Sequence, residues 1–115
     1  MSGKPLKYRN KPCMAGGIRF DSRAEAKRWA ELKLLERAGQ IVRLERQIAF
    51  PVIINGVLIC KYKPDFCYQE HGVIMGGLIC EDVKSPATAR NAAYRIKLKL
   101  ARALYPEWEF REIGK

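Results

Sequence analysis

Histidine is almost absent from this chain, and its cysteines are not closely paired. The one histidine is His71, and none of the four cysteines, Cys13, Cys60, Cys67 and Cys80, belongs to a CxxC pair. Structural zinc needs four nitrogen or sulfur ligands, which usually arrive as closely spaced pairs. We therefore expect no zinc site. Three of the cysteines lie in apolar, strand-like segments, where free thiols pack as small hydrophobic groups, and we expect no disulfides.

Long apolar runs are also missing. No segment approaches the roughly 20 apolar residues that a membrane-spanning helix needs, and the first ten residues contain no apolar signal-peptide core. We therefore expect a soluble, cytoplasmic protein without a membrane partner. A chain of 115 residues with 48% hydrophobic residues has enough apolar side chains for one folded domain with a single core.

Acidic residues are absent from two stretches, 1–19 and 88–102, each of which contains five basic residues. The whole chain carries 22 Lys and Arg against 12 Asp and Glu, a net charge of +10. This distribution favours a polyanionic partner, most simply nucleic acid, over a solvated basic face that serves only solubility. RNA is not excluded. The residues expected to contact nucleic acid are Lys11, Arg19, Arg90, Tyr94, Arg95, Lys97 and Lys99.

The first part of the chain predicts an arm followed by a helix. Residues 1–17 lack periodicity, and we expect a flexible basic arm there, with the folded domain spanning 18–115. Ser22 and Glu25 form a capping box that predicts a helix start, and Gly39 is a typical residue just beyond a helix end.

The rest of the chain predicts strands and a second helix. Asn55-Gly56 between two aliphatic pairs indicates a hairpin turn. Strands are expected over 57–61, 62–68, 73–84 and 108–113, and a helix over 88–104. Ala93, Ile96 and Leu100 lie on the apolar stripe of that helix. This order predicts an α/β fold with a mixed central sheet.

Charged residues gather at the ends of two expected strands. Asp65 lies near one strand end, and Asp82 and Lys84 close an otherwise apolar strand. Because side chains alternate along a strand, Asp82 and Lys84 share one face, Glu81 takes the other, and Asp65 can lie opposite Asp82. The alternative is an ordinary set of exposed polar residues with a surface ion pair.

Two nearby carboxylates suit a divalent cation. They repel each other by a few kcal/mol at about 4 Å, and hard oxygen ligands favour Mg²⁺, with Mn²⁺ as a substitute, over zinc. Such a cation lowers the pKa of a bound water and polarises a phosphate. Lys84 is placed to orient that water or to stabilise charge on the phosphate. These residues indicate phosphodiester hydrolysis.

Pro64-Asp65 followed by Asp82-Val83-Lys84 resembles the PD-(D/E)XK motif of the restriction-endonuclease-like nucleases. Residues 20–25, Gln47, 62–66 and 81–85 occur in the same order in a family of small phage and prophage nucleases. The same order is similar to that in the strand-cutting subunit of a heteromeric transposase and in archaeal-type Holliday junction resolvases. The resemblance covers about residues 20–110.

The resemblance implies an αβββαβ restriction-endonuclease-like core with two flanking helices. It also implies Mg²⁺ bound by Asp65, Asp82, the carbonyl of Val83 and Glu25. Glu25 is alternatively only the capping-box partner of Ser22, and Asp21 and Glu31 are weaker candidates on the same element. Gln47 matches a glutamine found near the metal or the water in such sites, and is alternatively a polar residue on a strand face.

The sequence thus predicts a Mg²⁺-dependent endodeoxyribonuclease with Asp65, Asp82, Lys84, Glu25 and Gln47 as catalytic residues. We expect it to be phage- or prophage-encoded and to act in the cytoplasm of a bacterial host. Branched or recombination intermediates are attractive substrates, and a two-fold homodimer is the hypothesis that suits them. Two alternatives remain: a nucleic-acid-binding module that does not cut, and a subunit that is active only with a phage or recombination partner.

Overall fold

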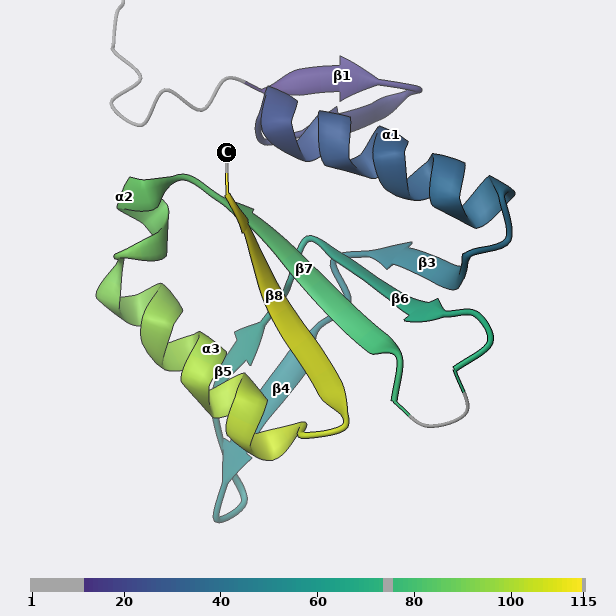
Figure 1. Ribbon diagram of the computed structural model, residues 1–115. Helices are drawn as coiled ribbons and strands as arrows, with labels where there is room; N and C mark the ends of the chain where they lie inside the picture. The colour runs from purple at the N-terminus through teal and green to yellow at the C-terminus, as the bar shows by residue number, and fades with distance from the viewer. Residues whose placement is uncertain (1–11, 74–75, 115) are drawn as a thin grey trace, which may run out of the picture.

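A four-stranded mixed sheet lies between two helices in the computed structural model, which describes residues 12–73 and 76–114 (Figure 1). The strand order is β3-β6-β7-β8, where β3–β6 and β6–β7 are antiparallel and β7–β8 is parallel. Helix α1 (Arg23–Arg37) and helix α3 (Ala92–Leu104) lie on opposite sides of this sheet. The predicted α/β class with a mixed central sheet is confirmed. The strands span β3 (Ile41–Arg46), β6 (Phe66–Glu70), β7 (Leu78–Lys84) and β8 (Trp108–Gly114).

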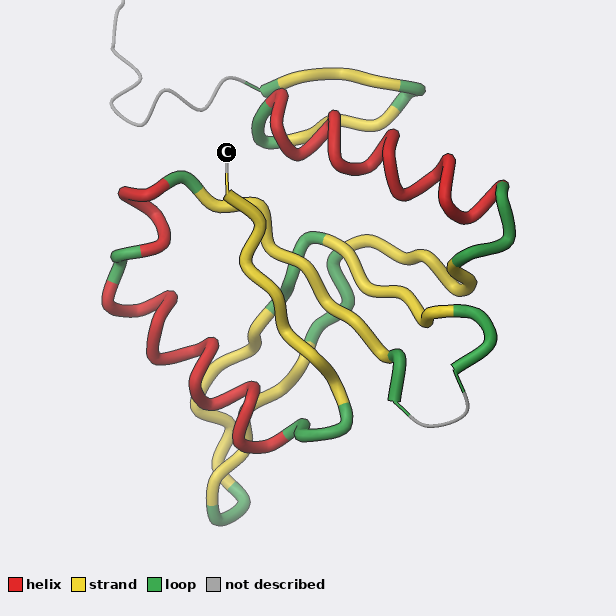
Figure 2. The backbone as a smooth tube through the Cα atoms, in the orientation of Figure 1, coloured by secondary structure: helices red, strands yellow, loops and turns green. Residues whose placement is uncertain are grey.

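The helices and sheet strands follow the expected αβββαβ order, with one hairpin added between β3 and β6. This hairpin joins β4 (Phe50–Ile54) to β5 (Val57–Tyr62) as a separate two-stranded sheet. Asn55 and Gly56 have φ of 49° and 79°, as a two-residue hairpin turn with positive φ at both positions requires. In Figure 2 the hairpin extends beyond α3, with its turn at the edge of the molecule.

The boundary expected for the N-terminal arm is wrong, because part of it is folded. Cys13–Ala15 forms β1, which pairs with β2 (Ile18–Phe20) beside α1. Gly16 and Gly17, which belong to the expected arm, both have positive φ and form the tight turn between β1 and β2. Residues 1–11 of the expected arm, Lys11 among them, lie outside the described residues.

The helix expected over 88–104 is two helices. Ser85 caps the short α2 (Pro86–Ala89), and the Asn91 side chain then accepts the Tyr94 N–H and starts α3. The buried face of α3 is also different from the expected stripe, since Leu98 and Ala101 are buried and Ile96 is 58% exposed. Helix α3 starts at Ala92 because Asn91 caps it. Its buried face is the one that contacts the β4–β5 hairpin and β8.

Two apolar clusters occupy the two faces of the sheet. The α1 side contains Phe20, Leu32, Ile41, Phe66, Tyr68 and Ile79. The α3 side contains Phe50, Tyr62, Cys67, Cys80, Leu98 and Phe110. No helix in the described part of the chain is both long and apolar enough to cross a membrane.

Strand β7 also buries two acidic side chains. Glu81, which is fully buried, accepts hydrogen bonds from Arg28 Nε and Nη2, both at 2.7 Å, and from the Tyr68 hydroxyl. Arg28 belongs to α1 and Tyr68 to β6, so this network connects the helix to the centre of the sheet. As strand alternation predicted, Glu81 faces α1 and takes no part in the grouping around Asp82.

Replacing Arg28 with alanine should lower the free energy of unfolding by about 3 kcal/mol, because Glu81 would remain buried without its counter-ion. Urea denaturation at pH 7 measures this, with Lys27→Ala on an exposed position of α1 as the matched control. Adding Glu81→Gln to the Arg28 variant should restore part of the loss. A loss no larger than that of the Lys27 variant would contradict this account.

Candidate functional site

Asp65 and Asp82 lie side by side at one end of the sheet. The register pairs Phe66 with Glu81, so continuing it by one residue places Asp65 opposite Asp82. Asp65 Oδ2 accepts the Val83 N–H at 2.8 Å. Because the N–H and C=O of one residue in an extended strand point to the same side, the Val83 carbonyl also faces the Asp65 side. The structure therefore brings together the residues that the motif predicted.

Asp82 is 1% exposed and is held by two side chains. Its Oδ2 accepts a hydrogen bond from the Tyr62 hydroxyl. Its Oδ1 has no hydrogen-bond partner among the described residues and faces the Lys84 ammonium at 3.4 Å, an ion-pair contact. Lys84 Nζ also lies 4.9 Å from the centre of the Tyr94 ring, a cation–π contact. Asp82 and Tyr94 together fix the position of the lysine.

Glu25, in the first turn of α1, is 3% exposed and has an unused oxygen. Ser22 Oγ accepts the Glu25 N–H at 3.1 Å, as the capping box predicted, whereas Glu25 Oε1 accepts the N–H of Asp21, at 3.3 Å, instead of that of Ser22. Glu25 Oε2 is buried and finds no hydrogen-bond partner in the described part of the chain. Capping therefore accounts for only one of the two oxygens.

The carboxyl groups here are short of positive charge. Burial raises the pKa of Asp65 to about 7, and the charges of Asp82 and Glu25 add to this effect, while the Val83 N–H and Lys84 oppose it. Burial also raises the pKa of Asp82, against the lowering effects of Lys84 and Tyr62. Burial and then the charge of Asp21 raise the pKa of Glu25. Raised carboxyl pKa values gathered in one place are typical of functional sites.

A small cavity of about 90 Å³ opens among these groups. It has room for a cation with several waters. Asp82 is not part of its wall, because Asp82 faces the α3 side of β7 and Glu25 approaches from the α1 side. Lys84, at the strand end, lines both this cavity and a second one on the α3 side. The wall of the first consists of Asp21, Ser22, Glu25, Asp65, Val83, Lys84, Ser85 and Thr88.

The donor set partly fits a hard cation. Within residues 12–73 and 76–114, no group of three or more His, Cys, Asp or Glu side chains is close enough to hold a metal ion. Carboxylate oxygens are nevertheless the ligands that Mg²⁺ prefers, and Glu25 Oε2 and Asp82 Oδ1 are buried without hydrogen bonds. Of the alternatives on the same element, Asp21 lines the cavity, whereas Glu31 forms an ion pair with Arg28 at 3.1 Å.

Gln47 lies outside the cavity wall. It occupies the connection between β3 and β4 with a φ of 54°, its side chain is exposed, and its N–H donates to the Asp65 carbonyl at 3.1 Å. Its contact with the site is therefore through the backbone. A role of its side chain near a metal or water stays a prediction.

The predicted nucleic-acid contacts are spread over several elements. Arg19, Arg90, Arg95 and Lys99 are exposed, and Arg95 Nη1 donates to the Ala89 carbonyl at 3.5 Å. Tyr94 is half-buried and donates from its hydroxyl to Glu112 at 2.9 Å. Among the members of this set that the structure describes, only Tyr94 and Lys97 line a cavity at the site, the one on the α3 side of β7.

Sequence reasoning missed Tyr62, which holds Asp82. The signal was present, since Tyr62 stands two residues before Pro64 and closes a strand, but only the fold shows which carboxylate it reaches. Arg46 was missed as well. It lies close enough for its charge to lower the pKa of Glu25, and it packs over Phe20 at 5.0 Å. Nothing in the local pattern of β3 distinguishes it.

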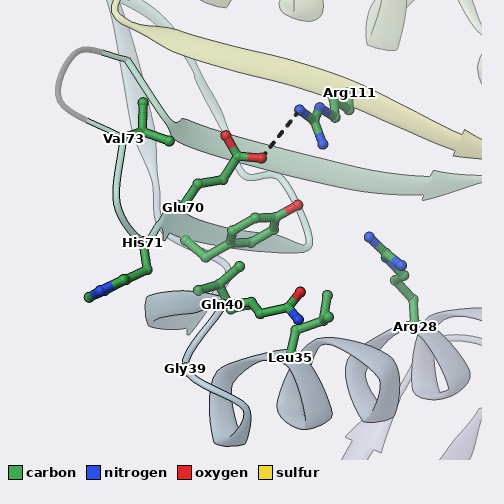
Figure 3. A pocket seen from close by; sticks show the side chains of 10 residues that line it. Arg28, Leu35, Gly39, Gln40, Glu70, His71, Val73 and Arg111 are labelled. Atoms are coloured by element: carbon green, nitrogen blue, oxygen red, sulfur yellow. Dashed lines mark ion pairs between the residues drawn. The ribbon is translucent and has the colours of Figure 1, made fainter.

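A larger hollow of about 600 Å³ lies elsewhere, between α1 and the far end of β6 (Figure 3). Its charged groups Arg28, Glu70 and Arg111 all form ion pairs. Arg111 contacts Glu70 at 4.0 Å, the dashed line in Figure 3, and Arg28 is engaged by Glu81 and Glu31. None of the predicted site residues lines it.

Comparison with known proteins identifies the family. The model of the family described as "Protein of unknown function (DUF1064)" matches residues 5–114, and the chain therefore belongs to this family. A search of curated proteins found no match.

Asp65→Asn should stabilise the metal-free protein at pH 8 and should have little effect at pH 4. The folded-state pKa near 7 lies above the ordinary value of 3.8, so ionising Asp65 costs folding free energy that is fully present above pH 7 and disappears as the pH falls toward 4. The asparagine oxygen can still accept the Val83 N–H. We expect about 2 kcal/mol at pH 8, measured by urea denaturation in EDTA.

The matched control for this pH series is Glu107→Gln, which removes an exposed carboxyl group away from the site. It should change stability by less than about 0.5 kcal/mol at either pH. A stabilisation by Asp65→Asn that does not change between pH 4 and pH 8 would show that Asp65 ionises normally in the folded protein.

Proposed function

We propose that this protein is a Mg²⁺-dependent endodeoxyribonuclease, with Mn²⁺ as a substitute. The observation that carries the proposal is the grouping of Asp65, Asp82 and Lys84 at one sheet end, beside a buried Glu25 oxygen without a hydrogen bond. The resemblance of residues 64–65 and 82–84 to the PD-(D/E)XK motif supports the same chemistry. So does the αβββαβ order of the elements.

Glu25 Oε2, an Asp65 oxygen and the Val83 carbonyl, on the side of the first cavity, are the groups that would hold the cation, with Asp82 Oδ1 as the proposed ligand from the other side of β7. A bound divalent cation neutralises phosphate charge and supplies a water of lowered pKa. Burial raises the pKa of both Asp65 and Asp82, and the charges of Asp82 and Glu25 raise that of Asp65 further; positive charge at this place would lower these pKa values again.

Lys84 is the group proposed to act on the phosphate. Asp82 and the Tyr94 ring hold its ammonium at the edge of the small cavity, where it can donate a hydrogen bond to a phosphate oxygen or to the attacking water. Because the lysine is fixed before substrate binds, little reorganisation is needed during reaction. Tyr62 acts through Asp82 as a positioning residue.

Substrate and setting belong to the same proposal. Net charge +10 and the basic residues of α3 and β2 support DNA as the partner. A branched or recombination intermediate cut by a two-fold homodimer, in the cytoplasm of a bacterial host that carries the phage or prophage, is the finer hypothesis.

One observation favours a second candidate, a subunit that needs a partner before it cuts. Asp82 faces away from the cavity that Glu25 and Asp65 share, and no three-ligand group exists among the described residues. A partner or the DNA itself would then have to complete the site. If no partner completes the site, the protein would be a nucleic-acid-binding module that does not cut.

Cleavage of labelled duplex, single-stranded and four-way-junction DNA tests the proposal, with Mg²⁺, with Mn²⁺ and with EDTA. The native protein should cut only with metal, and Asp65→Asn, Asp82→Asn and Lys84→Gln should each lower the rate about 100-fold or more. Glu107→Gln should cut normally. Binding of these DNAs without cleavage by either metal would refute the nuclease for the isolated chain.

A thermal melt tests the cation separately from catalysis. At pH 8, a Mg²⁺ concentration about tenfold above the dissociation constant should stabilise the native protein by about 1.4 kcal/mol, a rise of several degrees in Tm. Asp65→Asn should abolish the rise, and Glu107→Gln should keep it. Equal responses of the native protein and Asp65→Asn would remove Asp65 from the cation site.

A further inference from the structure

A second cavity, of about 380 Å³, lies on the α3 side of β7. Four of the residues in its wall are lysines, and they come from four places in the chain. Lys61 lies in β5, Lys63 in the loop after it, Lys84 at the end of β7 and Lys97 in α3. The other wall residues are Tyr62, Asp82, Asn91, Ala93 and Tyr94.

The cavity has a surplus of positive charge. Asp82 is the one acidic residue in its wall, so four lysines against one aspartate leave three positive charges. Among the ion pairs of the described residues, Lys84 is the only lysine of the four with an acidic partner. The ammonium groups of Lys61, Lys63 and Lys97 are therefore not neutralised by any described carboxylate.

The way the chain runs explains how two of these lysines point outward beside the site. Tyr62 is buried and donates to Asp82, and alternation along the strand places its neighbours Lys61 and Lys63 toward solvent, where both are exposed. Lys97 follows Tyr94 by three residues and lies on the same side of α3. The contacts that hold Asp82 thus also bring the lysines to the rim of the cavity.

We propose that this cavity binds one phosphodiester group of a nucleic-acid strand, next to the phosphate held at the carboxylates. This rests on the proposed function. Lys84 lines both cavities, so a strand that crosses Lys84 places neighbouring phosphates in the two. Lysine ammonium groups act as compact point charges and bind a phosphate without requiring a fixed orientation of it. Such contacts strengthen binding without reading sequence.

The test replaces Lys61, Lys63 and Lys97 together with glutamine, which removes the charges and keeps most of each side chain. Fluorescence anisotropy in EDTA, with labelled single-stranded and duplex DNA over a series of KCl concentrations, measures affinity and its salt dependence. The matched control is Lys27→Gln with Lys33→Gln and Arg37→Gln, three basic residues of α1 outside the cavity. A second variant replaces the three cavity lysines with arginine.

We expect the cavity variant to bind about tenfold more weakly or worse at moderate salt, with a slope of log affinity against log salt reduced by about 1. The α1 control should lose less than about twofold, and the arginine variant should keep the native slope. Melting curves confirm that each variant is folded. Equal losses in the cavity variant and the α1 control would overturn the proposal, as would native protein that binds neither DNA.

Inorganic phosphate offers the same chemistry as a strand phosphate. At equal ionic strength it should displace DNA no better than chloride does. Strong displacement of DNA from the native protein, absent in the glutamine variant, would assign the cavity to free phosphate in place of the strand.

Cleavage assays on the same proteins separate the two proposals. A native protein that never cuts, together with a cavity variant that loses affinity, refutes the nuclease and supports the phosphate site. A native protein that cuts, together with a cavity variant that binds and cuts like the α1 control, supports the nuclease and refutes the phosphate site.

Discussion

Strand β7 carries two buried carboxylates through the core, and much of the structure depends on how they are paired. Glu81 is fully buried and Asp82 is 1% exposed, and alternation sends them to opposite faces of the sheet. A charge buried without a partner costs several kcal/mol. Arg28 on α1 must therefore reach one face, and Lys84 with Tyr62 must reach the other. These pairings fix where α1 and the β4–β5 hairpin lie relative to the sheet.

The same alternation divides the candidate site. Glu25 approaches from the α1 side and Asp82 faces the α3 side, so the two carboxylates belong to different cavities. Two residues join these halves: Asp65, which reaches across to the Val83 N–H, and Lys84, which lines both cavities. The raised carboxyl pKa values follow from burying acids on both sides of one strand with few cations. Natural proteins keep such an unfavourable arrangement where it serves a function.

Local patterns in the sequence correctly predicted the features that depend on interactions between near neighbours in the chain. The Asn55-Gly56 turn, the Ser22 cap and the opposition of Asp65 to Asp82 each depend on a few neighbouring residues or on strand parity. Packing between distant segments decides the remainder. The apolar stripe expected on the second helix failed because the hairpin and β8 select its buried face, and the cap at Asn91 divides the helix. No local signal shows that Tyr62 reaches Asp82, twenty residues further along the chain.

The β4–β5 hairpin, inserted between β3 and β6 of the αβββαβ order, gives the second cavity its chemistry. Its last residue, Tyr62, faces the core and holds Asp82, while Lys61 and Lys63 on either side face outward. One short segment thus positions a buried acid and surrounds it with cations. Net charge alone could not identify these lysines, because the acid-free blocks lie at 1–19 and 88–102. Of the three lysines of the second cavity that have no acidic partner among the described residues, Lys97 alone belongs to such a block. The position of the second cavity therefore depends on which strand ends the fold brings together, and less on where basic residues are most frequent in the sequence.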